Sequence, residues 1–336
     1  MTWVTDPLVE LQPRTDAILL EFLAERRAAS GEGAPLVEEI ERVVTSGGKR
    51  LRPAFCYWGY RAAGGANEDA ISRCAASLEL LHTFAVVHDD IMDASDERRG
   101  QPAVHTRHGQ NVAILVGDLA LVLADDLFMT CGFEAEDIAR AFSVYSEMRQ
   151  QVIAGQFLDV TSVELPSITQ EQARLIANMK SGAYSVEKPL IVGATLARAS
   201  DELIEALCAF GQPLGEAFQL RDDLLGVFGD PADVGKPVGA DIREGKRNLL
   251  FAKTIGSLSP SERELFVSRW GHEDLTMQEI DELRSIVAAS GARAGTEELV
   301  EDLRSQAMKA LGGAPIPEDA RAALGALASA AVDRTD

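Results

Sequence analysis

Three aspartates at the end of an apolar stretch are the clearest candidates for chemistry. The stretch LELLHTFAVVHDDIMD covers residues 78–93 and ends in Asp89, Asp90 and Asp93. Asp89 and Asp93 are four residues apart, so on a helix their carboxylates project from one face. Like charges at the end of a buried helix repel each other and lose hydration unless a cation joins them. Either these aspartates form a solvated last turn, or they bind a cation.

A second acidic pair favours the cation. The segment AFQLRDDLLGVFGD carries Asp222 and Asp223, again at the end of an apolar run. We expect the two pairs, at equivalent ends of two buried helices, to face each other across a cavity. Mg²⁺ suits such a place because it takes one or two carboxylates, keeps waters and completes its shell with phosphate oxygens. The pattern therefore predicts magnesium and a phosphate-bearing substrate.

Clusters of fixed cations fit the same chemistry. Arginine binds phosphate through its planar fork, and lysine serves as a point charge. The individual clusters could each be a solvated helix end, but together they favour phosphate binding. The candidates are Lys49, Arg50 and Arg52 in SGGKRLRP, Arg98 and Arg99 in DERRGQP, Lys180 in NMKSGAYS, and Lys236, Lys246 and Arg247 in a later loop.

The elements that must position these groups are helices. Glycine pairs at 47–48, 64–65 and 312–313 indicate helix ends, because glycine adopts positive φ without strain. Capping boxes are indicated by Thr169 with Gln172, Ser259 with Glu262, and Thr276 with Glu279. Long apolar helices are predicted over residues 70–92, 111–129, 134–160 and 201–227. We therefore expect an all-α fold, one domain over residues 1–336, with long helices around a central cavity and the motifs within about residues 36–253.

Composition excludes several classes of protein. The 336 residues include 32 Lys and Arg against 53 Asp and Glu, a net charge of −21, which argues against a nucleic-acid partner. Hydrophobic residues make up 46% of the chain, enough for a large core. The four cysteines form no CxxC pair, and the N-terminus lacks the pattern of a signal peptide. We expect no membrane span, since Asp118 interrupts the longest apolar stretch, residues 112–123, and we expect a cytoplasmic protein.

The motifs taken in order resemble the trans-type polyprenyl diphosphate synthase family. GGKRLRP, DDIMD followed by RRG, and FQLRDD followed by GDP and a GK loop carry the resemblance. It implies an all-α homodimer with Mg²⁺, three ions per active site. The implied substrates are isopentenyl diphosphate and an allylic diphosphate (dimethylallyl, geranyl or farnesyl), joined head to tail.

The resemblance also assigns roles to single positions. Metal ligands would be Asp89, Asp90, Asp93, Asp222 and Asp223. Isopentenyl diphosphate would be bound by Lys49, Arg52, His82 and Arg99. The allylic diphosphate would be held by Arg98, Lys180, Ser181, Gln219, Lys236 and Lys246, of which Arg98, Lys180 and Lys236 would stabilise its departure together with the metal-binding aspartates. Gln156 and Asp159 match polar positions near the reacting centre. Gly226 departs from the pattern, since many relatives carry a third aspartate there.

Side-chain size before the first acidic motif is expected to set product length. Phe84 and Ala85 lie a little over one helical turn before Asp89, and Leu81 lies one turn further. A lone aromatic at position 84 resembles the geranylgeranyl type, so we expect a twenty-carbon product. Farnesyl or longer products remain alternatives, followed by a terpene cyclase, a non-catalytic partner subunit and a structural helical scaffold.

Overall fold

The structure, a computed structural model, describes residues 6–229, 239–272 and 274–333. These residues form two compact units, each built from three stretches of the chain. The first unit comprises Met1–Ser146, Lys188–Cys208 and Leu311–Leu327. The second comprises Glu147–Glu187, Ala209–Ala310 and Ala328–Asp336. The single domain expected from the sequence stays a prediction.

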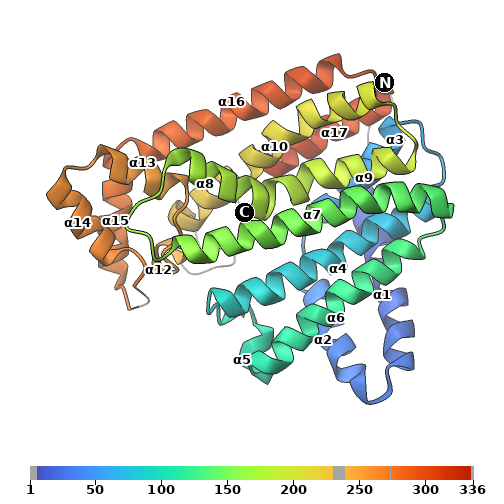
Figure 1. Ribbon diagram of the computed structural model, residues 1–336, viewed down its shortest axis with the longest axis horizontal. Coiled ribbons are helices and arrows are strands. Elements are labelled where there is room, and N and C mark those ends of the chain that lie inside the picture. Colours follow the sequence, from blue (N-terminus) through green and yellow to red (C-terminus); the bar gives the residue numbers. More distant parts are fainter. Residues whose placement is uncertain (1–5, 230–238, 273, 334–336) are drawn as a thin grey trace. The chain divides into compact units, whose positions relative to one another are not determined.

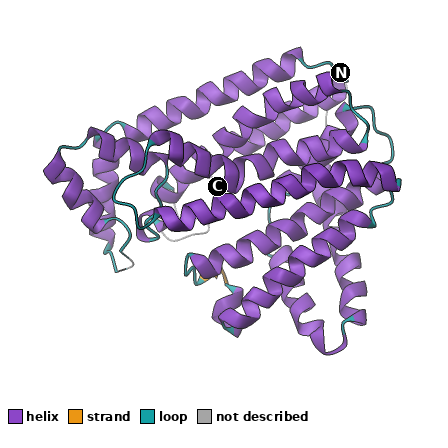
Figure 2. Ribbon diagram, in the orientation of Figure 1, coloured by secondary structure: helices purple, strands orange, loops and turns teal. Residues whose placement is uncertain are grey.

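Helices make up nearly all of the regular structure in the described part of the chain (Figures 1 and 2), which confirms the all-α prediction. The longer helices are α1 (Pro7–Ala29), α2 (Ala34–Thr45), α3 (Leu51–Ala62), α4 (Glu68–Met92), α6 (Gln110–Met129), α7 (Ala135–Ser162), α10 (Asp201–Phe228), α15 (Met277–Ala289), α16 (Ala292–Gly313) and α17 (Glu318–Val332). The shorter ones are η1 (Gly31–Gly33), α5 (Val104–His108), α8 (Gln170–Ala177), the π-helix η2 (Asn178–Glu187), α9 (Lys188–Leu196), α12 (Ala240–Arg243), α13 (Leu249–Ser257) and α14 (Pro260–Arg269). Two strands, β1 (Glu97–Arg98) and β2 (Gln101–Pro102), form one small antiparallel hairpin.

Local signals placed most helix ends correctly. Capping boxes begin α8, α14 and α15 at Thr169, Ser259 and Thr276, as the sequence predicts. The glycine pairs at 47–48 and 64–65 follow α2 and α3. The third pair, Gly312 and Gly313, ends α16, as the sequence predicts.

Helix α4 corrects the reason given for expecting no membrane span. Its 25 residues are long and apolar enough to cross a membrane by length and composition, although residues 112–123 were taken as the longest apolar stretch; the absence of a span itself stays a prediction. Within the structure, 72% of its most apolar window is buried. A core helix that is apolar on nearly all sides passes the same test as a membrane span.

Close helix crossings at glycine organise the first unit. Gly59 of α3 lies against the backbone carbonyl of Leu190, and Gly193 of α9 lies against that of Cys56. A Cβ at either glycine would overlap the opposing backbone. In the same unit α4 packs along α6, where Gly117 leaves room for the ring of His88. These contacts hold α3 and α4, the helices that carry the first group of candidate site residues.

Glycines also organise the second unit around η2. Gly155 of α7 lies against the backbone of Lys180 at one side of this π-helix. Gly182 of η2 and Gly215 of α10 touch through their backbone atoms, with no room for a Cβ at either. Helices α7 and α10 therefore both pack tightly on η2. π-helical turns are rare and frequent at functional sites.

Candidate active site

The first acidic motif occupies the last turn of α4. The Asp89 and Asp90 side chains lie within the helix, and Asp93 caps it, with its backbone N–H donating to the carbonyl of Asp89. The Asp90 side chain is 5% exposed, whereas that of Asp89 is 19% exposed. The macrodipole places partial negative charge at this end of the helix, so three carboxylates there need compensation by cations.

Arg98 supplies one such cation. Its Nε lies 2.9 Å from both carboxylate oxygens of Asp90, and its Nη2 donates to Asp90 Oδ1 at 2.7 Å. The same Nη2 is 3.7 Å from Asp89 Oδ2. Arg98 ends strand β1, and Arg99 and Gly100 form the hairpin turn with φ of 52° and 68°, both positive as a type I′ turn requires. The motif RRG thus forms a tight hairpin turn that places the Arg98 guanidinium in contact with Asp90 and near Asp89.

A cationic cluster forms beside α4 in the same unit. Arg99 Nη1 donates to the carbonyl of Gly47, and its guanidinium packs on Gly48, where a Cβ would crowd it. Burial lowers the pKa of the His82 imidazole well below its usual range. Positive charges near the ring lower it further, namely those of Arg52, Arg99, Arg98 and Arg50. The arginines around the neutral imidazole of His82 create a region of positive potential that is suited to an anion.

Arg50 differs from the expectation that it joins Lys49 and Arg52 as a phosphate ligand. Its side chain is 4% exposed and pairs with Glu79 of α4 and Asp16 of α1. Lys49 is exposed and Arg52 is half-buried in the first turn of α3. Sequence reasoning missed Glu79, because a glutamate inside an apolar stretch gives no sign of which cation it meets.

The second acidic motif lies in the last two turns of α10. Asp223 is 7% exposed, and Gln219 Nε2 donates to its Oδ1 at 2.8 Å. Burial raises the pKa of Asp223 to about 8, and the negative charges of Asp241 and Asp222 add to the effect. A carboxyl so placed favours either a proton or a cation.

Gly226 makes room for an aspartate from another element. A Cβ at position 226 would overlap both carboxylate oxygens of Asp241, a residue of α12 that is 6% exposed. Asn248 Nδ2 donates to Asp241 Oδ2 at 3.3 Å. The glycine that departs from the acidic pattern therefore lies directly against a carboxylate. Sequence reasoning missed Asp241, although its place in the loop GADIREGK could have drawn attention to it.

Lys180 and Asp159 meet within the second unit. The Lys180 Nζ lies 2.5 Å from Asp159 Oδ2, with the side chains 20% and 13% exposed. The contact exists because Gly155, one turn before Asp159 on α7, lets η2 approach closely. Ser181 follows in η2 and Gln156 lies on α7, both half-buried. The structure thus brings together two residues that the sequence placed at a diphosphate and at a reacting centre.

The later basic loop is described only in part. Lys236 lies outside the described residues. Lys246 Nζ is 2.7 Å from Glu244 Oε2 and 3.7 Å from Asp241 Oδ1. Arg247 is buried, donates to the carbonyl of Leu165 and stacks 4.3 Å over the ring of Phe251. Arg247 therefore serves the local fold rather than the phosphate site for which the sequence offered it.

The residues predicted to measure product length lie along α4. Leu81 is buried, whereas Phe84 and Ala85 are half-buried. The Phe84 ring packs edge-to-face on His88, with centroids 5.0 Å apart. His88 in turn lies 3.1 Å through Nε2 from the carbonyl of Ile114 on α6. His88 thus connects the Phe84 ring to the backbone of α6.

The donor atoms of both acidic motifs suit magnesium. Hard carboxylate oxygens are its preferred protein ligands, and one or two are enough when waters and substrate phosphates complete the shell. Asp89 and Asp93 lie one turn apart, and the buried Asp223 faces Asp241 with a strongly raised pKa. Among described residues no three His, Cys, Asp or Glu groups form a complete protein-only site. The chemistry fits an ion shared with diphosphate oxygens rather than an all-protein cage.

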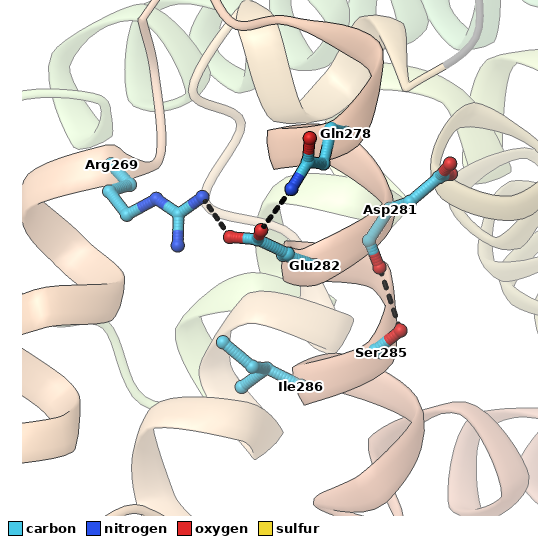
Figure 3. Close-up of a pocket in the computed structure, with 6 residues that line it drawn as sticks. All are labelled: Arg269, Gln278, Asp281, Glu282, Ser285 and Ile286. Carbon is cyan, nitrogen blue, oxygen red and sulfur yellow. Dashed lines mark hydrogen bonds and ion pairs between the residues drawn. The ribbon is translucent and has the colours of Figure 1, made fainter.

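A surface hollow of about 740 Å³ in the second unit is a separate feature (Figure 3). Its lining residues are Arg269, Gln278, Asp281, Glu282, Ser285 and Ile286. Figure 3 shows Glu282 accepting hydrogen bonds from Arg269 and Gln278, at 2.7 and 3.3 Å. The polar groups already bond one another and none belongs to a motif, so this hollow is not the candidate site.

Comparison with known proteins decides the family. The polyprenyl synthetase profile matches residues 34–287, further than the motif-bearing stretch that ends at Lys253. The chain belongs to the polyprenyl synthetase family. It is 33% identical to a geranylgeranyl diphosphate synthase of Saccharolobus solfataricus over 255 residues, 75% of this chain and 76% of the relative. It is 32% identical to a (2E,6E)-farnesyl diphosphate synthase of Mycobacterium bovis over 290 residues, 85% of this chain and 80% of that relative.

A solved structure of the family shows the same fold. The geranylgeranyl pyrophosphate synthase of Corynebacterium glutamicum, complexed with isoprenyl diphosphate and magnesium, superposes with a TM-score of 0.92 at 36% identity. The similarity covers 98% of this chain and 99% of that one. The likeness therefore extends over the C-terminal helices, where sequence motifs were lacking. The named products of these relatives differ, so family membership alone does not determine chain length.

Proposed function

We propose that this protein is a trans-prenyltransferase that joins an allylic diphosphate to isopentenyl diphosphate, with a twenty-carbon product. The observation that carries the proposal is the presence of one acidic helix end in each unit, with a cationic cluster beside the first, on a fold shared with a geranylgeranyl pyrophosphate synthase. Relatives named for geranylgeranyl and farnesyl diphosphate support prenyl transfer. The farnesyl product is the second candidate because a relative of that name covers 85% of this chain.

Two groups of side chains would hold the two substrates. Lys49, Arg52, His82 and Arg99 would bind isopentenyl diphosphate. A neutral His82 suits this role because it can donate one hydrogen bond and accept another. Arg98, Lys180, Ser181, Gln219, Lys236 and Lys246 would hold the allylic diphosphate.

The acidic motifs would hold magnesium on the allylic diphosphate. Asp89, Asp93 and Asp222 would be direct ligands, with Asp90 and Asp223 assisting, for a total of three ions. Magnesium bound there supplies stabilisation of the negative charge that builds up on the departing diphosphate. Asp90 serves mainly to orient Arg98, because the fork already occupies its oxygens.

The chain's own cations would act on the same charge. Arg98 and Lys180 lie partly buried, where hydrogen bonds to a developing anion are stronger than in water. Apolar walls would keep water from the allylic cation, and the basic cluster would hold the double bond of isopentenyl diphosphate against it. No side chain among the described residues is placed as an evident base for the final proton, which leaves the released diphosphate for that step.

The product assay tests the proposal directly. Purified protein is incubated with labelled isopentenyl diphosphate, Mg²⁺ and each allylic primer, and products are separated by chain length. We expect mainly a C20 diphosphate, shortened to C15 by Ala85→Phe and lengthened beyond C20 by Phe84→Ala. No condensation with any primer contradicts prenyl transfer. An unchanged product distribution in both variants contradicts only the role of Phe84 and Ala85.

A homodimer in the cytoplasm completes the proposal. Helix α6 supports the dimer, because its apolar residues Leu115, Val122 and Met129, spaced seven apart, are 53%, 61% and 50% exposed. Apolar side chains on one stripe of a helix are typical of a contact surface. Light scattering should report twice the mass of the 36.1 kDa chain, and Val122→Glu should halve that mass.

A further inference from the structure

The basic motif GGKRLRP contains one arginine that faces inward. Arg50 is the N-cap of α3, with φ of 54° and ψ of 38° in the left-handed region that disfavours residues other than glycine. Gly47 and Gly48 before it have φ of 111° and 131°. Such a segment has many accessible conformations when unrestrained, because glycine restricts the backbone least. Something must hold it in one conformation.

The Arg50 guanidinium restrains this segment through hydrogen bonds from all three of its nitrogens. Its Nε donates to Asp16 Oδ1 at 2.7 Å, and its Nη1 donates to Glu79 Oε2 at 2.9 Å. Its Nη2 donates to the carbonyl of Val44 at 2.7 Å, and Nη1 also lies 3.3 Å from the carbonyl of Gly47. One side chain thus joins α1, the end of α2, the glycine loop and α4.

Glu79 is the buried centre of this network. Its side chain is 6% exposed, and it lies on α4 three residues before His82, about one turn along the helix. The pair therefore connects the loop that carries Lys49 to the helix that carries His82. Arg99 closes the other side of the loop through the Gly47 carbonyl. A carboxylate at this point also offsets one charge in a place where several arginines gather.

We propose that Arg50 and Glu79 are positioning residues for the isopentenyl diphosphate site. The pair fixes the glycine loop and the strained start of α3, so that Lys49 and Arg52 meet the diphosphate in a preformed arrangement. Preformed cations bind an anion more tightly because no ordering is left to binding. This inference rests on the proposed function.

Steady-state kinetics on the full chain tests it, with each substrate varied in turn. Glu79→Gln keeps the shape of the side chain and removes the charge. We expect its KM for isopentenyl diphosphate to rise about tenfold, a loss of about 1.4 kcal/mol in binding, while the KM for the allylic primer changes less than about twofold. Glu79→Asp, which keeps the charge, should recover part of the affinity. Calorimetric titration with isopentenyl diphosphate alone should show the same order of affinities, with wild type the highest, Glu79→Asp intermediate and Glu79→Gln the lowest.

Asp137→Asn is the matched control. Asp137 forms an ion pair with Arg198 in the same unit, with side chains 10% and 56% exposed, and the ion pairs of Asp137 involve no motif residue. Both variants should lower the thermal midpoint, but only Glu79→Gln should raise the KM for isopentenyl diphosphate. Equal KM changes for both substrates, or kinetics matching those of the control, overturn the positioning role. If Glu79→Gln is insoluble, Asp16→Asn decides by the same criterion, with a smaller shift expected because Asp16 is 37% exposed. An inactive wild-type protein would instead contradict the proposed function.

Discussion

The two acidic motifs end helices in the same way but balance their charges differently. At the end of α4, the Arg98 fork compensates Asp90 directly, through contacts of 2.7 and 2.9 Å. At the end of α10, the neutral amide of Gln219 serves Asp223, and burial raises the pKa of this carboxyl to about 8. At the first motif, an arginine of the chain itself supplies a compensating charge. At the second, burial and the negative charges of Asp241 and Asp222 outweigh the charge of Lys246, so the pKa of Asp223 rises and a proton or a metal ion is favoured there.

The difference shows that similar sequence motifs can be prepared for a ligand in different ways. A carboxylate already paired with arginine is oriented but has fewer oxygens free for metal, as for Asp90. The charge of Asp241 adds to the raised pKa of the buried Asp223, and Lys246, 3.7 Å from Asp241, offsets part of this effect; a metal ion would offset more of it. We therefore expect metal binding to affect the stability of the second unit more than that of the first.

Removal of a predicted metal ligand should have the largest effect at either motif. Asp89→Ala and Asp222→Ala should each reduce turnover at saturating substrate by at least about a thousandfold, because activation of the leaving group is lost. Circular dichroism should remain that of a helical protein. Asp69→Ala is the control on α4, with a side chain 96% exposed in the first turn. Turnover near wild type in either variant would contradict the metal assignment of that motif.

The second largest difference between the two motifs is expected in how much each side-chain contact contributes to the free energy of unfolding. Arg98→Ala removes the arginine that contacts the buried Asp90 and should cost about 3 kcal/mol in the free energy of unfolding. Gln219→Ala removes a neutral hydrogen-bond donor from Asp223 and should cost about 1 kcal/mol. Urea unfolding without substrates measures both. Equal losses would mean that the arginine fork and the amide contribute alike.

A substitution of Gly226 tests how tightly α10 packs on Asp241 beside the second motif. Gly226→Ala places a Cβ against the Asp241 carboxylate and should destabilise the protein by about 1–3 kcal/mol. Gly256→Ala in α13 is the control, because nothing lies within 4 Å of its added Cβ. The control should stabilise by about 0.5–1 kcal/mol through helix propensity. A stable Gly226→Ala variant would show that Asp241 can move away freely.

The smallest expected effect is the pH dependence of stability that arises from His82, which lies on α4 with the first motif. The folded pKa of His82 is depressed, so below about pH 6.5 the unfolded chain binds the proton and the folded chain does not. Stability should therefore fall as the pH decreases from about 6.5, and it should be regained as the pH rises to 7. Four arginines face the ring, namely Arg50, Arg52, Arg98 and Arg99. Thermal unfolding at pH 5.5 and 7.5 should show a smaller difference for His82→Gln than for wild type, and an equal difference would refute a depressed pKa.

Local features of the fold could be predicted from sequence because their causes are local. The three capping boxes each join residues three apart, so the pattern of letters contains the whole interaction. The acidic motifs were recognisable because their aspartates are neighbours in sequence. The helix end expected at the glycine pair 312–313 is confirmed, since α16 ends at Gly313.

The sequence by itself determined the helical fold, the family motifs and the kind of chemistry. Only the tertiary structure decided which charge meets which. It turned Arg50 toward Glu79, 29 residues away, and Arg247 toward the carbonyl of Leu165, 82 residues away, rather than toward a phosphate site. It brought Lys180 to Asp159 because Gly155 allows η2 to approach, and it set Asp241 against Gly226. Such pairings depend on helix crossings between distant parts of the chain, and the spacing of letters carries no information about them.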